Sequence, residues 1–166
     1  FLAIAFSSWV TADGLTQPTS AAEQPRRIVS INLCTDQLLV ALADPGQIVG
    51  LSRYSRDEEM SFVAGEAARF PRLKGVAEEV LALKADLVLA GTFSGSATRA
   101  FLRQKGVRVE DFSPPRTFEE AKAEVQRAGK LLGQPQRARA LEAQIDEALN
   151  ALRPAGGKPL TALALM

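Results

Sequence analysis

Histidine and cysteine, two residue types that often carry catalysis and metal binding, are almost absent from this chain of 166 residues. The lack of any histidine excludes general-base catalysis by His, the Ser-His-Asp arrangement, and most zinc, copper and non-haem iron sites. Cys34 is the only cysteine, so neither an internal disulfide nor a cysteine-cluster metal site forms within the chain. Without a histidine or a second cysteine to act with it, we interpret Cys34 as a small apolar residue at the edge of a cleft.

Motifs for nucleotide binding and acyl transfer are also missing. The sequence has neither a G-x-G-x-x-G turn after a predicted strand nor a G-x-x-x-x-G-K-[ST] loop. Residues 91–95 have the spacing of a nucleophile elbow, but Phe93 stands where that motif needs Ser, and no His exists to activate Ser94. These absences count against an enzyme, and a small α/β hydrolase or redox domain with an unrecognised active site stays the alternative.

Aromatic, small polar and cationic side chains follow the predicted strands. Tyr54, the only tyrosine, and Phe93 supply aromatic faces, and Arg53, Arg56 and Arg116 supply positive charge. This combination suits a bulky, partly anionic ligand that is held without chemistry, although packing by Phe93 and solvation of the arginines is the simpler alternative. The candidate ligand-binding residues are Asn32, Leu33, Cys34, Thr35, Arg53, Tyr54, Thr92, Phe93, Ser94 and Arg116.

Short apolar runs alternate with helical spacing through the first two thirds of the chain. Strands are predicted at 27–31, 47–52, 85–90 and 106–112, and helices at 36–43, 78–84 and 96–105. The polar segment 53–74 is long for a loop and is typical of functional loops. Alternating strands and helices predict an α/β lobe with a Rossmann-like parallel sheet covered by helices on both faces, in which ligands bind at the carboxyl ends of the strands.

Two helices follow this region. Thr117 and Glu120 have the spacing of a capping box, and the helix that they open runs to Leu132. Pro135 suits the first position of a second helix, which we expect to reach Arg153 and to measure roughly 28 Å. The apolar segment 158–166 resembles the beginning of a strand.

The chain begins with an apolar stretch that we interpret as the remainder of an export signal. Residues 1–10 have the length of a signal-peptide core, and the polar, small residues up to position 24 are typical of a linker. The net charge of +1 and the lack of a long basic run argue against a nucleic-acid partner. The length suits one domain.

Three segments resemble a known family. Residues 26–39 (RRIVSINLCTDQLL) and 48–55 (IVGLSRYS) are similar to the start of periplasmic iron-siderophore and cobalamin substrate-binding proteins of ABC importers, and residues 81–89 (LALKADLVL) are similar to a later stretch of the same family. The resemblance extends from Arg26 to about Met166.

The resemblance implies two α/β lobes joined by one long rigid helix, with the ligand between the lobes. Residues 25–116 would then form the N-terminal ligand-binding lobe, and 117–153 a covering helix followed by the connecting helix. Residues 158–166 would be the first strand of a C-terminal lobe missing from this chain. The resemblance also implies roles for two residues: Tyr54 matches an aromatic that faces the ligand in cobalamin-binding members, and Glu78 matches an acidic residue that docks on the membrane permease.

The leading hypothesis is a periplasmic solute-binding protein that captures a ferric siderophore, haem or cobalamin and delivers it to an ABC importer. We expect a monomer that catalyses no reaction and has no cofactor of its own. The metal-ion branch of this fold uses His ligands, so the lack of histidine argues against bare zinc or manganese as cargo. A cytosolic sensor or adaptor domain is a third possibility.

Overall fold

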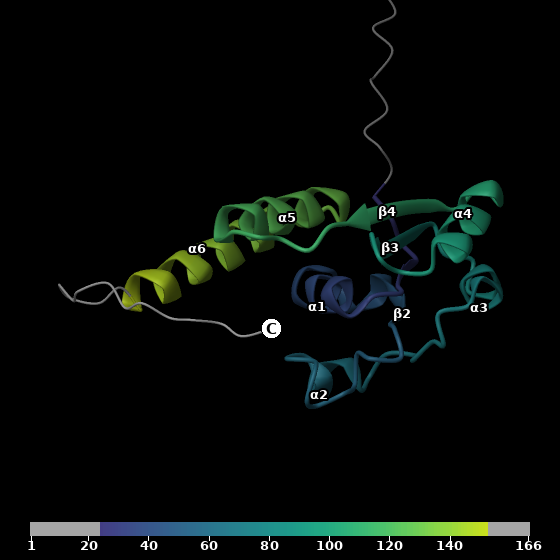
Figure 1. The fold of residues 1–166 in the computed structure, drawn as a ribbon, viewed down its shortest axis with the longest axis horizontal. Coiled ribbons are helices and arrows are strands. Elements are labelled where there is room, and N and C mark those ends of the chain that lie inside the picture. The colour runs from purple at the N-terminus through teal and green to yellow at the C-terminus, as the bar shows by residue number, and fades with distance from the viewer. Residues whose placement is uncertain (1–23, 153–166) are drawn as a thin grey trace, which may run out of the picture.

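Four parallel strands form one sheet in the order β2-β1-β3-β4, in a computed structural model that describes residues 24–152 (Figure 1). The strands are β1 (Ile28–Ser30), β2 (Ile48–Gly50), β3 (Leu87–Gly91) and β4 (Arg108–Phe112). The helices are α1 (Leu33–Leu42), the 3-10 helix η1 (Pro45–Gln47), α2 (Ala64–Ala67), α3 (Ala77–Ala82), α4 (Ser96–Gln104), α5 (Phe118–Leu131) and α6 (Pro135–Ala151). The predicted α/β class is therefore confirmed. The segments predicted at 1–24 and 158–166 lie outside the described residues, apart from Gln24.

The central strands β1 and β3 bury both of their faces, because each face is covered by helices. Ile28 pairs with Leu87, and both belong to the apolar cluster shared with α1, α5 and α6. The next pair, Val29 and Val88, belongs to a second cluster shared with α3 and α4. This alternation along paired strands explains why the sequence shows short continuous apolar runs rather than polar alternation.

Helix α1 begins earlier than predicted. The prediction placed a turn at 32–35 and the helix at 36–43, whereas the helix begins at Leu33. Asn32 is the cap, because its side-chain oxygen accepts hydrogen bonds from the N–H groups of Cys34 (2.9 Å) and Thr35 (3.4 Å). The first helical turn therefore lies directly at the end of β1.

The long segment after β2 follows the outside of the lobe and holds the short helix α2. It returns to the sheet where Leu51 forms a parallel bridge with Arg72, with backbone hydrogen bonds of 2.9 and 2.8 Å. Phe70 and Ala67 anchor it in the core. The bridge therefore fixes the two ends of this loop, and Phe70 and Ala67 fix it between them.

Helices α5 and α6 pack side by side after β4 (Figure 1). Thr117 caps α5 through a bond from the Glu120 N–H to its hydroxyl (3.1 Å), but the Glu120 carboxylate accepts from the Arg116 N–H (2.6 Å), so the predicted capping box is only half formed. The helices come into close contact at Gly129, where an added Cβ would lie 2.3 Å from the Cβ of Ala138. A glycine at this point lets α6 lie against α5.

Candidate functional site

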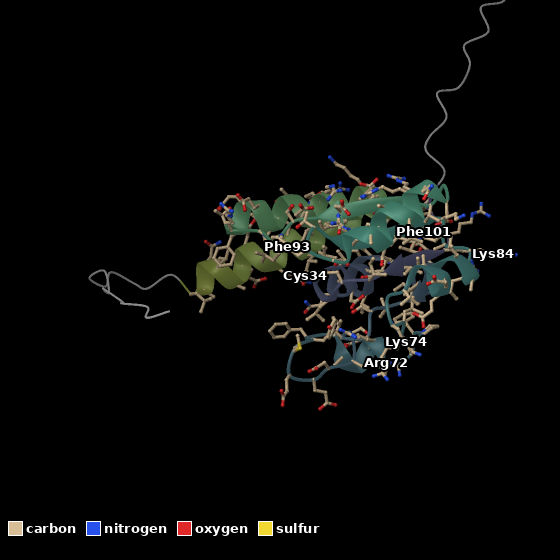
Figure 2. The ribbon with its side chains drawn as sticks, turned by 45° about the vertical axis from the view of Figure 1, so that its right-hand side comes forward. Cys34, Arg72, Lys74, Lys84, Phe93 and Phe101 are labelled. Atoms are coloured by element: carbon tan, nitrogen blue, oxygen red, sulfur yellow. The ribbon has the colours of Figure 1, made fainter. Side chains whose placement is uncertain are left out.

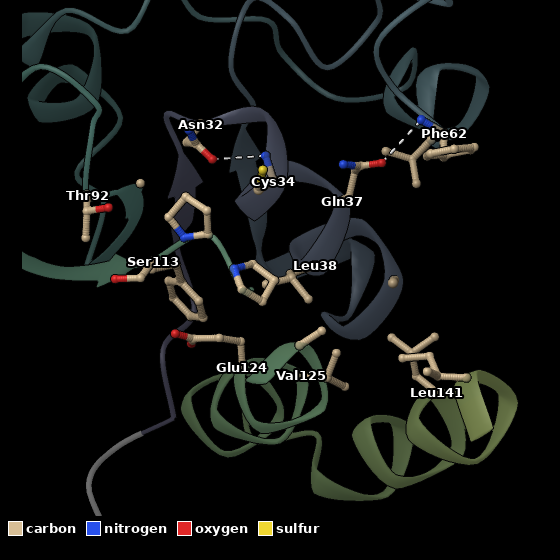
Figure 3. Close-up of a pocket in the computed structure, with 18 of the residues that line it drawn as sticks. Asn32, Cys34, Gln37, Leu38, Phe62, Thr92, Ser113, Glu124, Val125 and Leu141 are labelled. Carbon is tan, nitrogen blue, oxygen red and sulfur yellow. Dashed lines mark hydrogen bonds between the residues drawn. The ribbon is translucent and has the colours of Figure 1, made fainter. Parts of the chain in front are cut away.

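A cavity of about 720 Å³ opens at the carboxyl ends of β1, β3 and β4, as expected for a parallel sheet (Figure 3). Helix α1 forms one wall, and α5 and α6 form the other. Its lining is largely apolar, and among the described residues that line it Glu124 is the only Asp, Glu, Lys or Arg. The residues that line it are Asn32, Cys34, Gln37, Leu38, Ala41, Phe62, Val63, Gly91, Thr92, Phe93, Phe112, Ser113, Pro114, Pro115, Ala121, Glu124, Val125, Leu141 and Ile145.

Four of the predicted ligand-binding residues line this cavity: Asn32, Cys34, Thr92 and Phe93. Asn32 is held by its capping bonds and lies against Gly91, where an added Cβ would come within 2.7 Å of the Asn32 amide nitrogen. Cys34 is exposed in the first turn of α1. Figure 2 shows Cys34 and Phe93 on the same side of the lobe, away from Lys84 and Phe101. The structure therefore brings together the β1–α1 and β3–α4 connections, as predicted.

Two large aromatic side chains at the cavity are almost fully exposed. Phe93 is 88% exposed and Phe62 is 99% exposed. The N–H of Phe62 donates a hydrogen bond to the Gln37 side chain on α1 over 3.3 Å, which ties the long loop to the cavity wall (Figure 3). Exposed phenyl rings at an apolar cavity are typical of a binding surface. Sequence reasoning missed Phe62 and Gln37, although the length of the loop indicated that this segment was functional.

Three other predicted residues lie outside the cavity lining and serve the local structure. The Thr35 hydroxyl is buried and shares a 2.8 Å hydrogen bond with the Ser30 hydroxyl. Ser94 accepts the Gly91 N–H through its hydroxyl at 3.2 Å. Leu33 is half-buried in the first turn of α1. Their positions next to cavity residues make them a supporting layer for the site.

The predicted cations do not line the main cavity. The Arg53 guanidinium lies 4.7 Å above the centre of the Tyr54 ring and donates to its hydroxyl, and Tyr54 itself is 39% exposed. Arg56 donates to the Phe70 carbonyl over 2.5 Å. Arg116 lines an adjoining cavity of about 450 Å³ that shares Glu124 with the main one. Positive charge is therefore available beside the apolar cavity rather than inside it.

A buried carboxyl group connects α1 to the segment that carries Tyr54. Asp36 accepts hydrogen bonds from the Ser52 N–H (3.0 Å) and the Ser52 hydroxyl (2.5 Å), and the Tyr54 N–H donates to the Ser52 oxygen over 3.2 Å. Burial raises the pKa of Asp36, although hydrogen bonds from Ser30 and Ser52 oppose that effect. Asp36 thus fixes the start of the long loop.

The two acidic residues at the start of α3 have different environments. The Glu79 carboxylate accepts the N–H groups of Lys74 (2.8 Å) and Gly75 (3.3 Å), so it holds the loop before the helix. Glu78 is exposed, and no described residue forms a hydrogen bond or ion pair with its side chain. Of these two carboxylates, Glu78 is therefore the one that is available to a partner.

Within residues 24–152, no group of three or more His, Cys, Asp or Glu side chains has an arrangement suited to holding a metal ion. None of the helices in this part of the chain combines the length and apolar character that a bilayer span requires.

A family described as periplasmic binding protein matches residues 28–160. The chain belongs to this family. No curated protein gives a significant match.

Among solved structures, a periplasmic haem-binding protein from Pseudomonas aeruginosa is similar, with a TM-score of 0.65 and 27% sequence identity. The similar region covers 76% of this chain and 45% of the Pseudomonas aeruginosa chain. The apo form of a periplasmic haem-binding protein from Roseiflexus sp. RS-1 has a TM-score of 0.62 and 25% identity, covering 76% and 48%.

A more distant member of the same fold binds a different compound. The periplasmic vitamin B12 binding protein of Vibrio cholerae has a TM-score of 0.62 and 22% identity, covering 77% of this chain and 49% of its own. The chain therefore spans about half the length of these structures. The predicted family and the fold of one lobe are confirmed.

Proposed function

We propose that this chain contributes the N-terminal lobe of the solute-binding component of an ABC importer. Residues 25–116 form the lobe, and residues 117–153 hold the covering helix and the helix that connects to a second lobe. The protein captures a ferric siderophore, haem or cobalamin between its lobes in the periplasm and releases it to the permease. The observation that carries the proposal is the apolar cavity at the carboxyl ends of the strands, with Phe62 and Phe93 exposed at it.

The size and lining of the cavity favour a bulky ligand with an apolar outer surface. Its volume of about 720 Å³ lies within the range of small-molecule sites, roughly 300–1,000 Å³. Aromatic rings, prolines and aliphatic side chains on its walls suit an organic chelate better than a hydrated ion. Arg116 in the adjoining cavity offers a place for one anionic group of such a chelate.

The side chains at the cavity suit capture rather than catalysis. Within residues 24–152, Glu124 is the only carboxylate in the lining, and its oxygen accepts a hydrogen bond from Arg127 over 3.1 Å. Asn32 and Thr92 contribute polar groups that orient a ligand. A protein of this kind acts by binding, closing and docking, and Glu78 supplies the docking carboxylate for an arginine of the permease.

The experiment is a binding panel on the full-length protein with haemin, cobalamin and a ferric hydroxamate siderophore. Thermal shift identifies the compound, and titration calorimetry measures its affinity. We expect one of the three to raise the melting temperature and to bind tightly. Failure of all three to bind, or turnover of any of them, would overturn the proposal.

A further inference from the structure

The turn that carries Phe93 is held in one shape by backbone and side-chain hydrogen bonds. The Ser94 N–H donates to the Gly91 carbonyl over 2.9 Å, and the Gly91 N–H donates to the Ser94 hydroxyl over 3.2 Å. The Thr92 N–H donates to the Phe112 carbonyl on β4 over 2.9 Å. Between these bonds the Phe93 ring extends almost fully into solvent.

One arginine binds the carbonyl groups on both sides of Phe93. Arg99, in α4, donates through Nε to the Ser94 carbonyl (2.9 Å) and through one terminal nitrogen to the Thr92 carbonyl (2.8 Å). Its other terminal nitrogen pairs with the Asp111 carboxylate over 2.7 Å. The Arg99 side chain is only 13% exposed, so this guanidinium is part of the folded lobe rather than of its solvated surface.

We propose that Arg99 is a positioning residue of the ligand site, which presents Phe93 in a fixed orientation at the cavity before the ligand arrives. The inference rests on the proposed function, because it assigns Phe93 a contact with the ligand. Arg99 itself does not line the cavity and acts through the turn. A contact that is already ordered loses less conformational entropy on binding, so the ligand binds more tightly.

The geometry requires an arginine rather than any other cation. A planar guanidinium presents donors in several directions at once, and here three of them reach two carbonyls and a carboxylate. A lysine keeps the charge opposite Asp111 but cannot span the same three acceptors. The Arg99→Lys variant therefore tests whether the positive charge of Arg99 is sufficient or whether the shape of its guanidinium is also needed.

The same helix supplies a matched control. Arg103 pairs with the same Asp111 oxygen over 2.9 Å and also donates to the Val109 carbonyl, but it makes no bond to the turn 92–94. Removing Arg103 therefore weakens the same ion pair network without releasing the turn that holds Phe93.

The first experiment needs no ligand and follows amide hydrogen exchange in residues 91–95 of the full-length protein. In Arg99→Met and Arg99→Lys we expect exchange in this segment to be about fivefold faster, because each loses hydrogen bonds that hold the turn. In Arg103→Met the exchange of this segment stays as in the native protein. Unchanged exchange in Arg99→Met, or an equal increase in Arg103→Met, would overturn the proposal.

The second experiment measures affinity for whichever of haemin, cobalamin and ferric hydroxamate binds, with Arg99→Met placed in both the native and the Phe93→Ala backgrounds. We expect about threefold to tenfold weaker binding in the native background, the usual cost of ordering a side chain, and no further loss with Phe93→Ala. An equal loss in both backgrounds would mean that Arg99 does not act through Phe93. If none of the three compounds binds, the proposed ligand class fails, and the exchange experiment still decides the role of Arg99.

Discussion

The carboxylate of Asp36 is joined to Ser52 by two hydrogen bonds, one from the backbone N–H at 3.0 Å and one from the hydroxyl at 2.5 Å. Both residues are buried, and they connect α1 to the end of the β2 segment. The Ser52 oxygen then accepts the Tyr54 N–H over 3.2 Å. One carboxyl group therefore fixes the entry to the loop that later reaches the cavity at Phe62.

Asp36→Asn should destabilise the lobe by about 2–3 kcal/mol, because the amide NH2 faces buried donors that need an acceptor. Ser52→Ala should cost less, about 1–2 kcal/mol, since it removes the hydroxyl that donates to Asp36 and accepts the Tyr54 N–H but leaves the backbone bond to Asp36. Urea unfolding monitored by circular dichroism gives both values. Equal stability of Asp36→Asn and the native protein would show that the pair contributes nothing to folding.

The Asp111 carboxyl should make the lobe less stable in acid. Partial burial alone would raise its pKa, but hydrogen bonds and positive charge from Arg103 and Arg99 outweigh this and lower the pKa below the ordinary value of 3.8. A lowered pKa in the folded state means that the stabilisation is present above 3.8 and is lost as the pH falls through the folded-state pKa. Asp111→Asn should remove this part of the acid sensitivity, as measured by urea midpoints over a series of acidic pH values.

The Asp36 carboxyl changes the stability of the lobe with pH in the opposite direction to Asp111, because burial raises the pKa of Asp36. Its contribution to stability therefore increases as the pH falls through its folded-state pKa.

For Asp111, a stability profile of Asp111→Asn that is steeper in acid than the native profile would contradict the assignment.

Phe62 and Phe93 should contribute to ligand binding and little to folding. Replacing either with Ala removes an exposed ring at the cavity, so we expect affinity to fall by about 1–2 kcal/mol in a calorimetric titration, with little change in melting temperature. Phe118→Ala is the control, because Phe118 is 58% exposed but does not line the cavity. An equal loss in all three variants would mean that the effect is not specific to the site.

Glu78→Arg should impair transport and leave ligand affinity unchanged, since the side chain is exposed on α3 and bonded to no described residue. Uptake of the bound compound by whole cells is the measurement, alongside affinity in solution. Glu147→Arg on α6 introduces the same charge change at another exposed position and should transport normally. Normal uptake with Glu78→Arg would refute the docking role.

Gly129→Ala should destabilise the packing of α5 on α6. Its new Cβ would lie 2.3 Å from the Cβ of Ala138, and the resulting shift should cost about 2–3 kcal/mol, more than the gain of about 1 kcal/mol in helix propensity. Gly46→Ala is the control, because no atom lies within 4 Å of the added group. Urea unfolding that gives equal stability for the two variants would argue against tight contact between α5 and α6.

Local signals in the sequence determined the elements of this lobe. The apolar run 27–31, the cap at Thr117 and the proline at 135 each act within a few residues, so their structure follows from backbone preference and burial alone. The boundary of α1 was predicted less well, because both Asn32 and Thr35 suit a cap, and the contact of Asn32 with Gly91 on another strand favours the earlier start.

The composition of the site was decided by tertiary structure. The sequence predicted the two connections that hold Asn32 and Phe93, since the ends of parallel strands meet at one edge of a sheet. It did not reveal that the Phe62 N–H forms a hydrogen bond with Gln37, or that Arg53 and Arg56 lie outside the cavity lining. Nor did it reveal that α6 forms part of the cavity wall. Those contacts join residues far apart in the chain, and their formation depends on the packing of the whole lobe, which no short stretch of sequence encodes.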